Sequence, residues 1–305
     1  MFENFSTPKE LYPSDCRFGS GPSLVPVEYL EKLSQTGTTL LGTSHRKPAV
    51  KALVKEMQDG LTKLLDIPQD YLVVVGNGGA TFLFDMISLG MVEKKSTHYT
   101  CGEFSNKWYK AANKVPWIDA QEVNAEYGYG IEAKNVEGSD FIAVTLNETS
   151  TGVQNLNLPI VDKDTILAVD ATSGAGQIEC DISKTDMFYF SPQKVFASEG
   201  GFYVCIMSPK ALARARKISE DTSRYIPEIM NWNNAISNSA KNQTYNTPSI
   251  ATIFLLNEQI KKMNEDGYEA AIAYAKKKAD LLYSWADEKP YLSCFVKDPK
   301  DRSNA

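Results

Sequence analysis

An acid and a lysine, Asp170 and Lys194, each follow a short run of apolar residues. The runs at 165–169 and 187–190 have the length and the β-branched or aromatic content of buried strands. A Ser-Pro pair ends the second run, so Lys194 is expected on a short loop rather than on an exposed helix face. A lysine at the end of a buried strand loses hydration, which lowers the pKa of its amine and makes it a nucleophile.

The order of these two strands predicts that the two side chains meet. In open α/β sheets the ligand crevice lies at the carboxyl ends of the parallel strands, so Asp170 and Lys194 should share it. Pyridoxal phosphate needs an acid beside its pyridine nitrogen and a lysine that binds its aldehyde. The acid keeps the ring nitrogen protonated, and the lysine amine moves the α-proton of the substrate. A single lysine on a loop is more often an exposed surface residue. The expected position of Lys194 beside Asp170 favours a catalytic role instead.

A glycine-rich turn earlier in the chain is a candidate phosphate site. An apolar run at 71–75 leads into Gly76-Asn-Gly-Gly-Ala-Thr81, and a helical pattern begins at Phe82. This order presents backbone N–H groups and a helix dipole to an anion, and Thr81 can add a hydroxyl. The turn matches neither the dinucleotide fingerprint nor the P-loop, and many such turns bind nothing.

Three other segments carry candidate ligand-binding residues. Phe104 follows a short strand and is placed to stack on a planar ring, although such aromatics are more often core. Thr149 follows the apolar run 141–146 and can donate a hydrogen bond to a phenolate oxygen. His45 and Arg46 share a polar loop and would suit an anion clamp, while an exposed loop with incidental charges is an equally good interpretation.

The bulk composition narrows the classes of function. The 305 residues are 43% hydrophobic and 23% charged, which is ordinary for a soluble globular protein with one large and one smaller domain. A net charge of −6 gives no electrostatic reason to expect nucleic acid or an anionic membrane as a partner. Neither a secretory signal nor an apolar run of membrane-spanning length is found, so a cytoplasmic location is expected. Two histidines and five scattered cysteines predict reduced thiols and no metal site.

Strands that alternate with helices predict the fold class. Helical spacing of apolar residues is found at 49–65, 209–217, 250–260 and 268–285, between the apolar runs described above. A further strand is expected to start at 295–296. This pattern indicates an α/β fold with a mainly parallel sheet.

Taken in order, the motifs resemble those of the fold type I pyridoxal-phosphate aminotransferases. More narrowly, the chain resembles the class V phosphoserine aminotransferase family in the form known from actinobacteria. The resemblance runs from about residue 17 to residue 304, and it depends on the ordered set rather than on any one motif. The motifs are Phe18-Gly-Ser-Gly-Pro22, Gly42-Thr-Ser-His-Arg46, Gly76-Asn-Gly-Gly-Ala-Thr81, Gly102-Glu-Phe104, Asn147-Glu-Thr-Ser-Thr-Gly152, Asp170-Ala-Thr-Ser-Gly174, Ser191-Pro-Gln-Lys194 and Lys241-Asn-Gln-Thr-Tyr-Asn-Thr-Pro248.

The resemblance implies a role for each of several residues toward the cofactor. Lys194 would bind the aldehyde and Asp170 the pyridine nitrogen, while Phe104 would stack on the ring and Thr149 would contact its oxygen. Both subunits of a homodimer would bind each cofactor phosphate. One subunit would contribute Ala80, Thr81 and Gln193, and the other would contribute Asn246 and Thr247.

The resemblance also implies a substrate site and a reaction. Ser20, His45 and Arg46 would belong to the site for the substrate phosphate or for the side-chain carboxylate of glutamate. The reaction would transfer an amino group between glutamate and 3-phosphooxypyruvate, giving 2-oxoglutarate and O-phosphoserine in serine biosynthesis. A side activity on the corresponding phosphorylated threonine analogue would serve pyridoxine biosynthesis.

The domain organisation follows from the same resemblance. An N-terminal arm (1–16), a large cofactor-binding domain (17–258) with a seven-stranded sheet flanked by helices, and the start of a small C-terminal α/β domain (259–305) are expected. The family's chain continues for tens of residues and carries there an arginine for the substrate α-carboxylate, which Arg302 does not match. The small domain is therefore expected to be truncated and the affinity for substrate reduced.

Two alternatives stay open at this point. One is another fold type I enzyme, such as a cysteine desulfurase or a lyase, which is disfavoured because no cysteine lies in a glycine-rich loop after the lysine. The other is a substrate-impaired protein that binds pyridoxal phosphate and acts as a dimeric binding module. The expected truncation motivates this second alternative.

Overall fold

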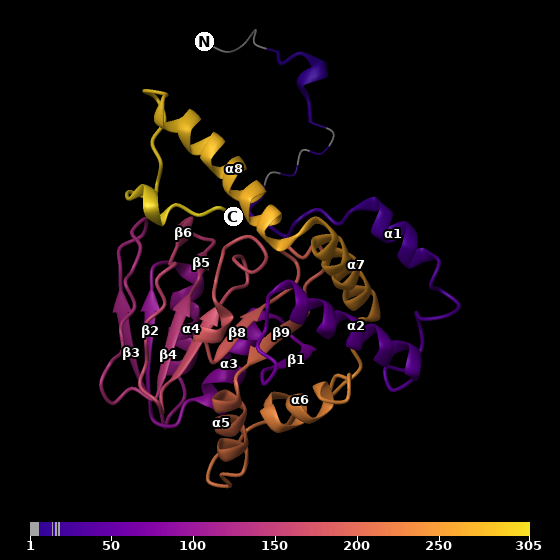
Figure 1. Cartoon of the computed structure of the whole chain (residues 1–305). Helices are drawn as coiled ribbons and strands as arrows, with labels where there is room; N and C mark the ends of the chain where they lie inside the picture. The colour runs from indigo at the N-terminus through magenta and orange to yellow at the C-terminus, as the bar shows by residue number, and fades with distance from the viewer. Residues whose placement is uncertain (1–5, 14, 16, 18) are drawn as a thin grey trace.

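A seven-stranded sheet forms the centre of the computed structural model, which describes residues 6–13, 15, 17 and 19–305 (Figure 1). Its spatial order is β1-β9-β8-β7-β4-β2-β3, and β9 alone runs antiparallel to its neighbours. The strands are β1 (Leu72–Asn77), β2 (Lys95–Thr100), β3 (Asp119–Asn124), β4 (Phe141–Thr145), β7 (Ile166–Asp170), β8 (Met187–Phe190) and β9 (Phe202–Met207). The predicted α/β fold with a mainly parallel sheet is confirmed.

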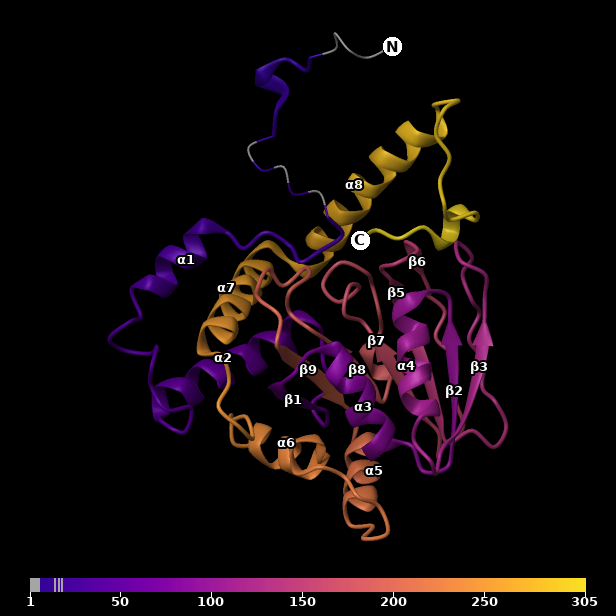
Figure 2. The same ribbon diagram turned by 180° about the vertical axis from the view of Figure 1, so that it is seen from behind.

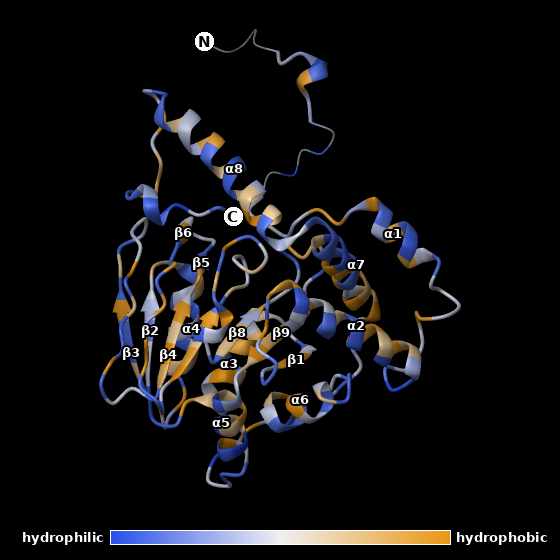
Figure 3. Ribbon diagram, in the orientation of Figure 1, coloured by the Kyte–Doolittle hydropathy of each residue, from blue (hydrophilic) through white to orange (hydrophobic). Residues whose placement is uncertain are grey.

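The central strands are buried along their whole length because helices cover both faces of the sheet. Every residue of β4, β7, β8 and β9 is buried, as expected for the near-continuous apolar runs of a covered parallel sheet. One face packs against α2 (Pro48–Leu64) and α7 (Ile250–Asp266). The other face packs against α3 (Ala80–Met91), α4 (Glu103–Asn113), α5 (Pro209–Ser219) and α6 (Trp232–Ser239). Figure 3 shows the hydrophobic residues gathered in the strands of the sheet.

Two helices lie outside these layers. Helix α1 (Val27–Ser34) packs against α7, and α8 (Tyr268–Asp287) continues from α7 away from the sheet (Figure 2). Only Ala275 of α8 is buried. Helix α7 runs through the expected domain boundary at 258/259 without a break, and Ile260 and Met263 belong to the core beside the sheet. The division into domains stays a prediction.

The remaining elements are short. A two-stranded hairpin of β5 (Asn147–Glu148) and β6 (Val153–Gln154) follows β4. The 3₁₀ turns are η1 (Lys9–Leu11), η2 (Ile182–Lys184), η3 (Glu228–Met230) and η4 (Pro299–Asp301). In the described part of the chain, no helix has both the length and the apolar character needed to span a membrane.

Several expectations differ from the structure. The strand expected to start at 295–296 is wrong: those residues form bends. The sequence reading missed β3, whose residues are polar and mostly accessible to solvent because it lies at the sheet edge. It also missed α6, because that helix is only two turns long and rich in asparagine and serine. Part of the N-terminal arm, Cys16 and the Phe18 of the first glycine motif lie outside the described residues.

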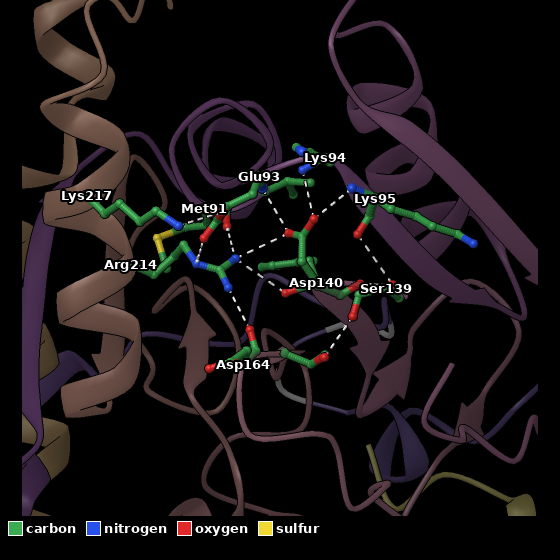
Figure 4. Close-up of polar contacts among 12 residues, drawn as sticks. Met91, Glu93, Lys94, Lys95, Ser139, Asp140, Asp164, Arg214 and Lys217 are labelled. Carbon is green, nitrogen blue, oxygen red and sulfur yellow. Dashed lines mark hydrogen bonds and ion pairs between the residues drawn. The ribbon is translucent and has the colours of Figure 1, made fainter. Parts of the chain in front are cut away.

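An ion-pair network joins α5 to the amino-terminal ends of β2 and β4 (Figure 4). The Arg214 guanidinium, with a side chain only 9% exposed, pairs with Glu93 (Nε–Oε1 2.7 Å) and Asp140 (Nη1–Oδ1 3.2 Å). It also donates to the carbonyl oxygen of Asp164 at 2.6 Å. The Asp140 carboxylate in turn accepts the backbone N–H groups of residues 93–95 at 2.7–2.8 Å. The network therefore fixes the end of the sheet opposite to the predicted crevice.

Replacing Arg214 by methionine should lower the free energy of unfolding by about 3 kcal/mol, because two carboxylates then lose a largely buried partner. The matched control is Lys217→Met, which removes a cation from the same Glu93 but from a side chain that is 67% exposed. Its cost should stay below about 1 kcal/mol. Urea denaturation of both variants measures the difference, and equal losses would contradict this account of the network.

Candidate active site

A cavity of about 250 Å³ lies at the carboxyl ends of β1, β4, β7 and β8. These strands are mutually parallel, so the residues that follow them meet at one edge of the sheet. Seven of the predicted site residues line this cavity: Ala80, Thr81, Phe104, Thr149, Asp170, Gln193 and Lys194. A larger hollow of about 1030 Å³ lies along α8 and contains none of the predicted site residues.

Lys194 lies on the loop after β8 and is half-buried. Its Nζ donates a hydrogen bond to the carbonyl oxygen of Ser20 at 3.2 Å. Burial lowers the pKa of the Lys194 amine below its ordinary value. The neutral, nucleophilic form is therefore favoured, as the sequence predicted.

A segment near the N-terminus crosses the lysine loop. The backbone N–H of Ser23 donates to the Gln193 carbonyl oxygen at 2.8 Å, and its hydroxyl donates to the carbonyl oxygen of Lys194. A Cβ at Gly21 would lie 2.6 Å from both Cδ and Nζ of Lys194. Gly21 also has a φ of +127°, which favours glycine, and its lack of a side chain lets the segment lie directly against Lys194.

Asp170 ends β7 and is 3% exposed. Thr172 donates to its Oδ1 through both the backbone N–H (2.9 Å) and the hydroxyl (2.6 Å). Burial raises the pKa of the Asp170 carboxyl to about 6, and the two bonds from Thr172 oppose that rise. Such an acid is suited to pair with a cationic group that enters the cavity.

Helix α3 starts at the cavity after the predicted glycine turn. Gly78 and Gly79 have φ angles of +141° and +110°, which favour glycine, and no side chain among the described residues accepts a hydrogen bond from the first N–H groups of the helix. The Gly78 N–H donates to the carbonyl oxygen of Gly201 at 3.0 Å. The positive end of α3, at Ala80 and Thr81, therefore faces the cavity and suits an anion.

Phe104, at the start of α4, and Thr149, in the turn after β5, both line the cavity. Phe104 is the second residue of α4, and the Lys107 Nζ lies 5.1 Å from the centroid of its ring. The Thr149 hydroxyl donates to Ser173 Oγ at 2.7 Å. The side chain of Thr149 is thus held in place by another residue of the cavity wall.

The other five predicted residues do not line the cavity. Ser20 touches it only through the carbonyl that binds Lys194. His45 is buried, and burial followed by the charge of Arg46 lowers the pKa of its imidazole. Arg46 is exposed and donates to Gln243 Oε1 at 3.4 Å.

Asn246 and Thr247 are exposed and lie beside the end of β1. The Thr247 carbonyl accepts a hydrogen bond from Asn77 Nδ2 at 2.7 Å, and Asn77 is followed directly by the glycine turn. The Asn246 carbonyl accepts one from the Thr244 hydroxyl at 2.7 Å. Their side chains remain accessible on the outside of the molecule.

The sequence reading missed five polar residues of the cavity wall: Thr145, Asn147, Thr172, Ser173 and Ser191. Thr145 pairs with Asp170 in the strand register, so the parallel pairing of the two runs was the signal that would have found it. Three buried polar atoms of the lining residues have no hydrogen-bond partner among the described residues: Thr145 Oγ1, Asn147 Oδ1 and Gln193 Oε1. Buried polar groups are rarely left unpaired, so the wall is built for a polar ligand.

These groups fit pyridoxal phosphate. An amine of lowered pKa, a buried acid of raised pKa and an uncapped helix start surround one cavity. They match the aldehyde, the ring nitrogen and the phosphate of that cofactor in turn.

Sequence and structure comparisons with known proteins agree with this choice of cofactor. The family model for class-V aminotransferases matches residues 18–305. The phosphoserine aminotransferase of Nocardioides sp. is 42% identical over 311 residues, which cover 99% of this chain and 82% of that protein. The crystal structure of a phosphoserine aminotransferase from Cytophaga hutchinsonii matches with a TM-score of 0.87 and 27% identity, over 94% of this chain and 81% of that one. The pyridoxal-phosphate-bound phosphoserine aminotransferase of Trichomonas vaginalis shares the fold, with a TM-score of 0.79 and 24% identity over 94% and 81% of the two chains.

The raised pKa of Asp170 predicts a pH-dependent stability for the protein stripped of bound small molecules. Because the folded pKa is about 6 against an ordinary value of 3.8, the contribution of Asp170 to stability is fully present below pH 3.8 and is lost as the pH rises through 6. Asp170→Asn removes this loss, so it should be more stable than wild type at pH 8, by about 3 kcal/mol, with little gain near pH 3.8.

Urea denaturation at several pH values measures this gain. The control is Asp221→Asn, since hydrogen bonds from Ser223 lower the pKa of that carboxyl and no gain should appear. If the difference in stability between Asp170→Asn and wild type does not change with pH, the pKa of Asp170 is not raised by burial and this account is wrong.

Proposed function

This chain belongs to the class-V aminotransferases, which depend on pyridoxal phosphate, and we propose that it transfers an amino group between glutamate and 3-phosphooxypyruvate. The products are 2-oxoglutarate and O-phosphoserine, the precursor of serine. One observation supports the proposal above the others: Lys194 and Asp170 line a single cavity together with the uncapped start of α3.

Bound in this cavity, pyridoxal phosphate supplies an electron sink for the bond that breaks at the substrate α-carbon. Lys194 would hold the cofactor aldehyde until the substrate amine displaces it, and the released amine, of lowered pKa, would then take and return the α-proton as general base and acid. Asp170, buried and held by Thr172, would keep the ring nitrogen protonated. Ala80, Thr81 and Gln193 would bind the cofactor phosphate, Phe104 would cover the ring, and Thr149 would contact the ring oxygen.

The substrate's phosphate and the side-chain carboxylate of glutamate need a cationic site outside the cofactor cavity. Arg46, exposed beside His45, supplies the charge, and Ser20 is held next to Lys194 through its carbonyl. A guanidinium suits both anions because it can donate two parallel hydrogen bonds. A side activity on the phosphorylated threonine analogue would use the same site.

We further propose that the protein is a cytoplasmic homodimer. Asn246 and Thr247 are exposed beside the glycine turn and do not line the cavity of their own chain. In a dimer their side chains would reach the cofactor phosphate of the partner. The chain would divide into the arm 1–16, the cofactor-binding domain 17–258 and the small domain 259–305.

Covalent binding and turnover test the reaction. After loading with pyridoxal phosphate, wild type should show the visible absorption band of a lysine-bound cofactor, and glutamate should abolish that band while 2-oxoglutarate forms. Lys194→Ala should show neither change, whereas Lys184→Ala, an exposed lysine on η2, should behave as wild type. Mass mapping after borohydride reduction should place the label on Lys194.

Three outcomes would redirect the proposal. A protein that stays colourless after loading would exclude the cofactor. A loaded protein on which glutamate has no effect would be a binding module rather than an aminotransferase. Release of sulfide from cysteine would indicate a desulfurase.

Mixed dimers test the composite phosphate site. Lys194→Ala and the double variant Asn246→Ala/Thr247→Ala should each have little activity as homodimers. When the two are unfolded together and refolded, hybrid dimers should contain one site with an intact lysine and an intact partner loop. Activity of the mixture should then rise to about a quarter of wild type, because half of the dimers are hybrids and half of their sites are intact. No recovery, in dimers verified by sedimentation, would contradict the shared site.

A further inference from the structure

Helix α4 begins against a buried carboxylate, that of Glu148 at the end of β5, to which the reaction assigns no role. The side chain is fully buried. Its Oε2 accepts hydrogen bonds from the backbone N–H (2.9 Å) and the hydroxyl (2.8 Å) of Ser105. Its Oε1 accepts the backbone N–H of Phe104 at 3.3 Å. A charge that would be costly to bury is therefore placed at the positive end of a helix.

Ser150 completes the arrangement. Its hydroxyl donates to Glu148 Oε1 at 2.7 Å and accepts the backbone N–H of Glu103 at 2.9 Å. The N–H groups of the first three residues of α4 thus all end on Glu148 or on Ser150. The first N–H groups of a helix have no partner within the helix. In α4, side chains from a separate hairpin accept these hydrogen bonds.

Gly102 is shaped to fit this acid. A Cβ at Gly102 would lie 2.4 Å from Cγ and 2.6 Å from Cδ of Glu148. The backbone of Gly102 is extended, so glycine is needed here for space rather than for its conformation. The Glu148 side chain therefore packs directly on the turn that leads to Phe104.

The two helices that start at the cavity differ in this respect. Both contribute lining residues, α3 through Ala80 and Thr81 and α4 through Phe104. In the part of the chain that the structure describes, no side chain caps α3, whereas the start of α4 already holds an internal anion. An incoming phosphate is therefore attracted to α3 and repelled from α4.

We propose that Glu148 is a positioning residue. It fixes the start of α4, and with it the ring of Phe104, and it directs the cofactor phosphate to α3. This inference rests on the proposed cofactor, and Glu148 itself touches neither cofactor nor substrate.

The primary test is Glu148→Gln. The amide has the same size, but its NH₂ group must face a donor of Phe104 or Ser105, so the start of α4 loosens. We expect the dissociation constant for pyridoxal phosphate to rise about tenfold, the change expected when a charge-assisted hydrogen bond is lost. The visible circular dichroism per bound cofactor should also change, because it reports the surroundings of the ring.

The matched control is Glu122→Gln. Glu122 also contacts α4, but through Asn106 Nδ2 at 2.8 Å, and it accepts the Thr100 hydroxyl at the same distance. It has no contact with the helix N–H groups. Its dissociation constant and dichroism should equal those of wild type.

A double-mutant cycle separates positioning from general stability. Phe104→Leu should weaken cofactor binding, and adding Glu148→Gln should weaken it little further, because both changes act on the same ring. Far-ultraviolet dichroism confirms that each variant is folded. If Glu148→Gln fails to fold, Ser150→Ala removes one donor to the same carboxylate and should raise the dissociation constant about threefold.

The outcomes separate this inference from the proposed function. Wild type that binds no pyridoxal phosphate would overturn the cofactor itself. Wild type that binds, with a folded Glu148→Gln variant (or Ser150→Ala in its place) that matches it in affinity and dichroism, would overturn the role of Glu148 alone. Additive losses in the cycle would overturn the positioning of Phe104 by Glu148, since Glu148 would then act by a route other than that ring.

Discussion

The burial of two ionisable groups at one edge of the sheet, Asp170 and Lys194, is the constraint on which the site depends. Burial favours the neutral form of each, so it raises the pKa of the acid and lowers that of the amine. Both shifts require the strands behind them to be covered on both faces. The two helical layers provide that cover, and the Arg214 network fixes the opposite end of the sheet at β2 and β4.

Anion binding at this edge of the sheet depends on whether side chains already bind the first N–H groups of each helix. The first turn of α3 comes after two glycines of positive φ, and none of the described side chains caps it. The first turn of α4 meets Glu148 and Ser150 instead. The start of a helix therefore serves as a proposed anion site in α3 and as a fixed support for Phe104 in α4. The two starts differ in the residues that precede them and in the hairpin that packs on α4.

Much of this arrangement was predictable from the sequence, because its main signals are local. Apolar runs that end in Asp170 and before Lys194, and the glycine turn before Thr81, indicated both the strands and their shared edge. No role was predicted for Glu148, although it belongs to the motif at 147–152. Its partners are backbone N–H groups of a helix that is distant in sequence, so no local pattern indicates them. Strand β3 escaped prediction because an edge strand with polar residues lacks the apolar run that marks a covered one.

The hydrogen bond from the Gly78 N–H to the Gly201 carbonyl has a consequence for how the site tolerates change. It ties the turn before α3 to the end of the loop that carries Lys194, so main-chain geometry sets the spacing between the two. Substitutions that repack side chains around the cavity leave that spacing intact. An insertion or deletion of a single residue in either turn alters it and shifts the start of α3 relative to the loop that carries Lys194.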